Sequence, residues 1–161
     1  MAHLAVPELT QAVSVLAATM GVARLRDRLA QHGAFKSRQG LNSAEAIAER
    51  LYRLTGGLRL QVPATYVFSS LWSEMVSEKL GEEGAKQLDE LAEQVNACLT
   101  DHDTIVPGKE DELDRALAAY REAVAAATGP DVARLDMLMK AVPVVAERLR
   151  TAPASAPAPE V

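Results

Sequence analysis

The residues most able to bind a metal ion are a histidine between two aspartates, Asp101, His102 and Asp103. Carboxylate oxygens are the ligands that calcium prefers. Read as a calcium loop that starts at Asp101, the segment has acids at its first, third and twelfth positions, the last being Glu112. The fifth position is Ile105, where the motif requires an oxygen ligand, and the sixth is not glycine. We therefore expect an acidic, solvent-exposed loop without a metal.

The sequence around the candidate nucleophiles does not match a catalytic motif. The single cysteine, Cys98, excludes an intrachain disulfide framework and a cysteine-based zinc site. It lies among apolar residues of a predicted helix, so we expect a small buried hydrophobic residue. Ser69, Ser70 and Ser73 lie on another predicted helix, and no Gly-x-Ser-x-Gly elbow occurs.

Motifs that bind cofactors or pair metal ligands on helices are also missing from the sequence. The glycine doublet Gly56-Gly57 is not followed by the lysine of a phosphate-binding loop. No Glu-x-x-His pair occurs, so a metal site inside a helical bundle would have no ligands. We therefore expect no cofactor, and nothing in the sequence predicts an enzyme.

The charge distribution is the most informative feature of the sequence. Residues 1–60 carry a net charge of +4 and residues 61–161 carry −9. Such a separation can mark a binding surface. Two predicted helices in the basic part, joined by the segment 33–42, resemble a helix-turn-helix only loosely, since this connection is too long. The start of the second helix also lacks side chains that read base edges.

Any nucleic-acid binding would therefore use the phosphate backbone. The candidate contacts are the basic residues Arg24, Arg26, Arg28, Lys36 and Arg38.

Length and composition predict one all-α domain. The chain has 161 residues, of which 48% are hydrophobic and only 4% aromatic, so leucine, valine, alanine and methionine must form the core. We expect a compact bundle of five to seven helices over residues 1–150 and a disordered Ala/Pro-rich tail over residues 151–161. No apolar run is long enough for a membrane span, and the first residues do not resemble a signal peptide. We therefore expect a cytoplasmic protein that does not enter membranes.

Start and stop signals divide the chain into helices. The first starts near Pro7 and is interrupted at Gly21, and the second ends at Gly33. A third starts at Asn42, where the Asn42 side chain and Glu45 can form a capping box, and ends at Gly56. Residues 58–62 are predicted to be an extended linker.

Further helices are predicted over residues 63–81, 82–100 and 113–128. The broadest apolar face belongs to the helix over residues 63–81, and it includes Trp72, so we expect a buried indole.

The last predicted helix starts near Asp131, and Pro143 either kinks it or begins a new segment. Its main apolar face is spaced 3-4-3-4, at Leu135, Leu138, Val142, Val145 and Leu149. Three further apolar residues lie off this face and form a candidate protein interface: Val132, Met139 and Val144. We therefore expect a non-enzymatic interaction or assembly module, either a homo-oligomer or a small subunit of a larger complex. The alternative is a nucleic-acid-associated helical subunit.

Overall fold

The computed structural model describes residues 4–55 and 62–151, which form seven α-helices and no strand. The helices are α1 (Val6–Met20), α2 (Val22–Gln31), α3 (Ala44–Thr55), α4 (Val62–Asn96), α5 (Glu110–Thr128), α6 (Pro130–Lys140) and α7 (Pro143–Thr151). The prediction of an all-α bundle with five to seven helices is confirmed. Thr151, assigned above to the tail, is the last residue of α7. The rest of the predicted tail and most of the predicted linker lie outside the described residues.

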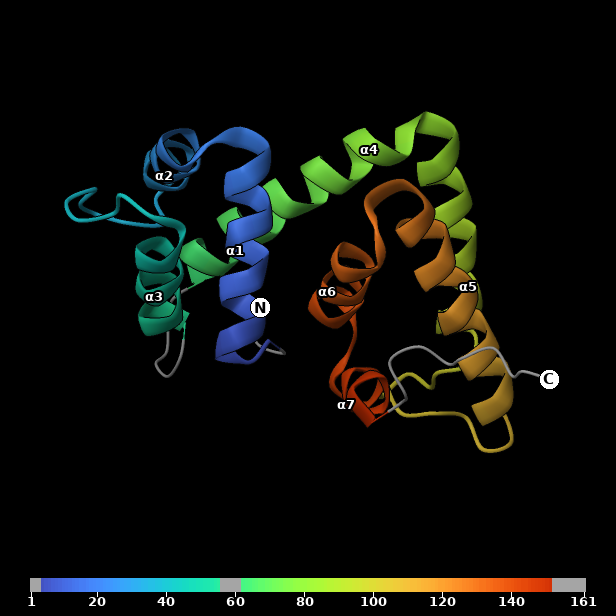
Figure 1. Cartoon of the computed structure of the whole chain (residues 1–161). Coiled ribbons are helices and arrows are strands. Elements are labelled where there is room, and N and C mark those ends of the chain that lie inside the picture. The colour runs from blue at the N-terminus through green and yellow to red at the C-terminus, as the bar shows by residue number, and fades with distance from the viewer. Residues whose placement is uncertain (1–3, 56–61, 152–161) are drawn as a thin grey trace.

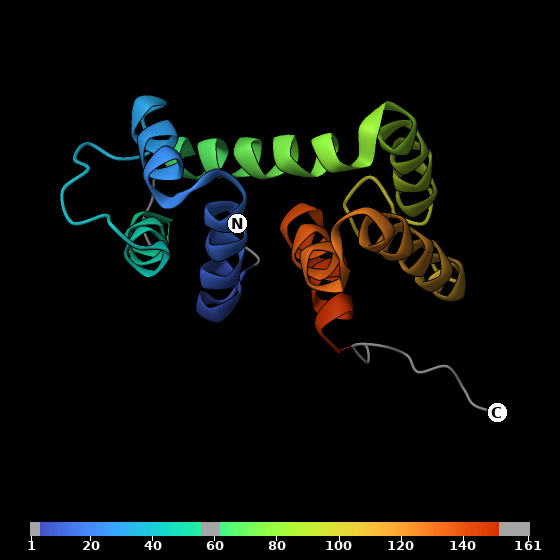
Figure 2. The same ribbon diagram turned by 45° about the horizontal axis from the view of Figure 1, so that its top comes forward.

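Helix α4 connects two groups of helices. It runs from the group α1–α3 along one side of the molecule and turns into the group α5–α7 (Figures 1 and 2). The turn is at Gly81, whose φ of 76° and ψ of 175° are not helical. Glycine adopts this conformation without the steric penalty of a Cβ atom. The predicted boundary at Gly81 is therefore a sharp bend between two helical halves, with no loop between them.

Helix α2 ends as predicted at a glycine. Gly33 has a φ of 92°, and its backbone N–H donates to the carbonyl of Ala30. The N–H of Ala34 reaches back to the carbonyl of Leu29 at 2.8 Å. This pair of hydrogen bonds is a Schellman motif, which satisfies carbonyls that the helix end leaves free.

The predicted cap of α3 is wrong by one residue. The Ser43 Oγ accepts a hydrogen bond from the backbone N–H of Ala46 at 3.1 Å, so Ser43 is the capping residue. The Asn42 Oδ1 accepts a hydrogen bond from Arg26 Nη1 at 3.4 Å. The Asn42 side chain contacts α2 instead, and the side chain of Ser43 accepts the hydrogen bond from a free backbone N–H at the start of α3.

Two clusters of buried apolar side chains form the core. The larger unites α1–α4 with parts of α5 and α6, and it includes Leu9, Val13, Leu16, Leu25, Leu29, Ile47, Leu51, Phe68, Trp72 and Leu135. The smaller lies among the C-terminal helices and consists of Cys98, Leu113, Leu117, Met137 and Val145. The predicted burial of Trp72 and of Cys98 is confirmed.

The predicted 3-4-3-4 face does not exist as one face of one helix. Helix α6 ends at Lys140, Ala141 is extended, and Pro143 starts α7. Proline has no backbone N–H to donate to the preceding turn, so the helix cannot continue through it. As a result Leu135 packs in the larger cluster and Val145 in the smaller one.

Among the described helices, none is by itself long and apolar enough to cross a membrane. Helices α1 and α2 reach that length and composition only as a pair, and the chain bends by 107° between them.

Candidate functional site

A buried carboxylate links α4 to α6. Asp136 is fully buried, and its Oδ1 accepts a hydrogen bond from Trp72 Nε1 at 2.9 Å. The same oxygen lies 3.2 Å from the Nζ of Lys140, one turn later on α6. Oδ2 has no hydrogen-bond partner among the described residues. A buried charge is costly unless it is paired and hydrogen-bonded, and these two contacts offset that cost. Only the hydrogen bond from Trp72 joins α6 to α4, because Lys140 lies on the same helix as Asp136.

Tyr120 of α5 interacts electrostatically with Asp136. Burial, together with the negative charges of Asp136 and Asp89, raises the pKa of Tyr120 to about 12. The phenol is therefore protonated and uncharged at neutral pH, and its O–H can donate a hydrogen bond.

The sequence analysis did not identify Asp136. The available signal was a single aspartate inside the apolar run of α6, with Lys140 four residues later. Its partner Trp72 is 64 residues away in the chain, so the contact could not be inferred from spacing. The hydrogen bond between Trp72 and Asp136 joins two helices.

The predicted nucleic-acid residues lie on α2 and on the connection to α3, and most of them are paired. Arg26 Nε lies 2.9 Å from Asp27 Oδ1, and Arg38 Nε lies 3.6 Å from the same oxygen. The hydrogen bond from Arg26 is the main cause that lowers the pKa of Asp27. Arg28 Nη2 lies 3.6 Å from the Oε1 of Glu74 on α4.

Arg24 and Lys36 are the two members of this basic set for which the described residues provide no ion pair; both are exposed. The structure thus places all five residues in one region, but three of them already contact carboxylates.

The predicted protein-interface residues are partly covered within the chain. Val132 and Met139 pack at the edge of the larger core cluster, and Val144 packs at the edge of the smaller one. All three are half-buried, and they do not share one cluster. Their role in an interface stays a prediction.

The exposed side of α4 before its bend is a surface that the sequence analysis missed. Tyr66 is 68% exposed, more than any other large hydrophobic residue among those described. It lines a shallow, open depression with four serines and two glutamates of the same helix: Ser69, Ser70, Ser73, Glu74, Ser77 and Glu78. We call these seven residues the Tyr66 face. The signal is present in the sequence, since the four serines fall opposite the broad apolar face of the same helix.

The acidic loop between α4 and α5 is held by its threonines. The hydroxyl oxygens of Thr100 and Thr104 are 2.7 Å apart, and the N–H of His102 donates to Thr100 Oγ1. Asp101, His102 and Asp103 are exposed. In the described part of the chain, no three His, Cys, Asp or Glu side chains lie close enough together to hold a metal ion.

No protein-family model, curated protein or solved structure matches this chain.

Proposed function

We propose that this chain is a non-enzymatic helical interaction module that binds a partner protein through the Tyr66 face. The observation that carries this proposal is the exposure of Tyr66, whose side chain is 68% accessible on a helix whose other side is in the core. Tyrosine is enriched among residues that dominate binding energy in protein interfaces, because it buries a large ring and offers a hydroxyl.

The rest of the Tyr66 face defines the chemistry of the partner. Serine side chains are small, so a second helix can approach α4 closely. Glu74 and Glu78 are both exposed, but Glu74 already lies 3.6 Å from Arg28 of α2. We therefore expect a helix with an apolar pocket for the Tyr66 ring and with a lysine or arginine opposite Glu78.

Site-specific photo-crosslinking tests this proposal. A benzophenone amino acid at position 66 should form a discrete adduct in native lysate, and the same group at position 52 should not. Tyr52, on α3, is the matched control because it is a tyrosine that is 43% exposed. Light scattering of the purified chain shows whether the partner is a second copy. Equal crosslinking from positions 52 and 66, or none from either, would refute the Tyr66 face as an interface.

The predicted interface residue Met139 is less suitable for this test. Because Met139 packs against the larger core cluster, Met139→Glu would place a charge at a partly buried position. Lost association in that variant could reflect unfolding alone.

The alternative function, binding to a phosphate backbone, is supported by the grouping of basic residues on α2 and the connection after it. Gel shifts at several salt concentrations test it. Of the five candidate residues, Arg24 and Lys36 are the two without a carboxylate contact among the described residues. If those two carry the binding, the log–log salt slope on duplex DNA should be shallow, about −2. A slope near −4 that is abolished in Arg24→Ala/Arg26→Ala/Arg28→Ala would favour this alternative over the protein interface.

A further inference from the structure

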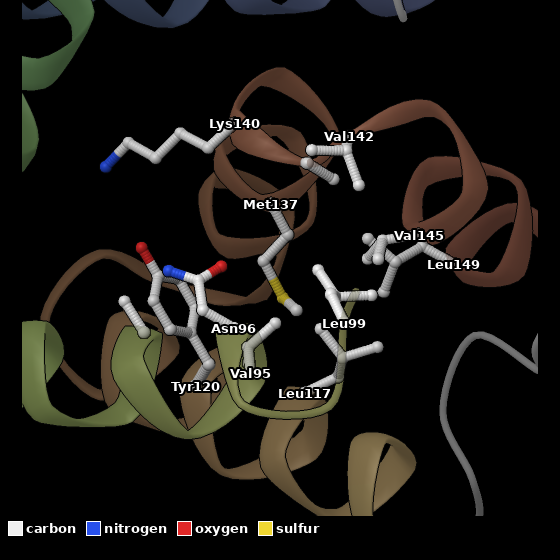
Figure 3. Close-up of a pocket in the computed structure, with 12 residues that line it drawn as sticks. Val95, Asn96, Leu99, Leu117, Tyr120, Met137, Lys140, Val142, Val145 and Leu149 are labelled. Atoms are coloured by element: carbon white, nitrogen blue, oxygen red, sulfur yellow. The ribbon is translucent and has the colours of Figure 1, made fainter. Parts of the chain in front are cut away.

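The smaller core cluster does not fill the space that its helices enclose. A partly enclosed cavity of about 230 Å³ lies between the second half of α4, α5, α6 and α7 (Figure 3). Apolar side chains form most of its wall, among them Val95, Leu99, Leu117, Met137, Val142 and Leu149. An apolar cavity of about 150 Å³ already holds benzene in a protein where one was engineered, so this one is large enough for a small organic molecule.

Polar groups line one end of the cavity. Figure 3 shows Asn96, Tyr120 and Lys140 on one side and the aliphatic side chains of Val142, Val145 and Leu149 on the other. Tyr120 contributes a phenol and Asn96 an amide, which can both donate and accept hydrogen bonds. A ligand could therefore bury an apolar body among the aliphatic groups and place one polar group at this end.

The charges around the polar end favour an uncharged ligand. Among the described residues that line the cavity, Lys140 is the only cation, and its Nζ already lies 3.2 Å from the buried Oδ1 of Asp136. An anionic ligand would compete with Asp136 for this ammonium group, and a cationic ligand would find no carboxylate among the same lining residues. The raised pKa of Tyr120, about 12, agrees with a neutral hydrogen-bonding end.

We propose that this cavity binds an uncharged small molecule with one ring or a short alkyl body and a single hydroxyl or carbonyl group, which hydrogen-bonds to Tyr120. The site is separate from the Tyr66 face, so this inference does not depend on the proposed partner protein. It adds a small-molecule binding function to the chain.

Calorimetric titration with three probes that share a propylbenzene body tests the proposal. The probes are para-propylphenol, propylbenzene and para-propylbenzoate. The phenol should bind most tightly, and the benzoate should bind at least about tenfold more weakly because its charge would be desolvated without a free cation. In Tyr120→Phe the affinity for the phenol should fall about fivefold, whereas the affinity for propylbenzene should stay the same.

Filling the cavity should abolish binding. Ala92 lines it from α4, and Ala92→Leu places three more carbon atoms into the space. The matched control is Ala126→Leu, at an exposed position of α5, which should bind the phenol as the wild type does. Cooperative thermal unfolding verifies that each variant is folded, and Val142→Phe repeats the test from another wall if Ala92→Leu does not fold. The proposal is overturned if the wild type shows no binding of the phenol up to about 1 mM, if the filled variant binds as well as the control, or if the benzoate binds best.

Discussion

At the scale of single residues, the most consequential contact is the hydrogen bond from Trp72 to Asp136. The indole is fully buried, and its ring stacks against Phe68 with centroids 6.5 Å apart. Among the described residues, the indole N–H and the Lys140 ammonium are the two groups that contact the buried Asp136 carboxylate. Trp72 therefore contributes both apolar burial and a hydrogen bond to a buried charge.

The substitution Trp72→Phe separates these two contributions. It keeps an aromatic ring in the core and removes the N–H donor, so we expect a loss of about 2–3 kcal/mol in the free energy of unfolding. Trp72→Ala also creates a cavity and should cost about 3–5 kcal/mol. Urea denaturation measures both, with Tyr66→Ala as a control that should change stability by less than about 0.5 kcal/mol. If Trp72→Phe is as stable as the wild type, the hydrogen bond to Asp136 contributes nothing.

At the scale of the helices, the residues at helix ends and bends decide where each element starts and turns. The first example is α3, whose start is capped by Ser43 and not by the asparagine before it. Ser43→Ala should cost about 1 kcal/mol, because the N–H of Ala46 loses its acceptor. Asn42→Ala, which removes only an exposed contact with Arg26, should cost about 0.3 kcal/mol. Chemical denaturation measures the free energy of unfolding of both variants. A larger loss in Asn42→Ala than in Ser43→Ala would show that Asn42 is the capping residue.

The second example is the bend of α4. An alanine at position 81 would have to adopt a φ of 76° and a ψ of 175°. Residues other than glycine rarely adopt this backbone conformation. The space around the new Cβ is open, so the expected cost of about 1–3 kcal/mol for Gly81→Ala comes from the backbone alone. Ser77→Ala, on the exposed side of the same helix, is the control and should be neutral within about 0.5 kcal/mol. Thermal unfolding tests the pair, and an unchanged midpoint for Gly81→Ala would mean that the bend is not required.

At the scale of the whole molecule, Glu8 connects the first helix to the last two. Its Oε2 accepts a hydrogen bond from Arg134 of α6 at 3.1 Å, and its Oε1 accepts one from Arg150 of α7 at 3.0 Å. The Ala5 N–H also donates to Oε1. Burial alone would raise the pKa of Glu8, but the hydrogen bond from Ala5 and the two guanidinium groups outweigh it and lower the pKa below its ordinary value.

This shift predicts a specific pH dependence. Because the pKa is lower in the folded state, the contacts of Glu8 stabilise the protein above the pKa of an unfolded glutamate, about 4.3, and the stabilisation is lost as the pH falls through the folded value. Glu8→Gln should therefore be about 1 kcal/mol less stable than the wild type at about pH 7, and the difference should shrink below about pH 4.

Urea unfolding at several pH values measures this difference. Glu90→Gln, at an exposed position of α4, should leave the pH profile unchanged. A constant difference between Glu8→Gln and the wild type across the whole pH range would show that the carboxylate charge plays no part.

The sequence by itself determined the all-α class, most helix ends and most of the buried face of each helix. These properties depend on residues within about four positions of one another: apolar spacing, a glycine at a helix end, a proline at a helix start. The prediction failed where two local signals competed, at Asn42 and Ser43. At Pro143 the alternative of a new segment is confirmed, and the apolar pattern across it does not form one face because it continues over two helices.

Tertiary structure alone decided which groups from distant segments meet. Trp72 lies 64 positions from its partner Asp136, and the two arginine partners of Glu8 lie 126 and 142 positions away. The cavity among α4, α5, α6 and α7 exists because four separate helices pack without filling the space between them. Local spacing holds no information about such contacts, because they follow from how the helices cross and from how side-chain volumes match across the core.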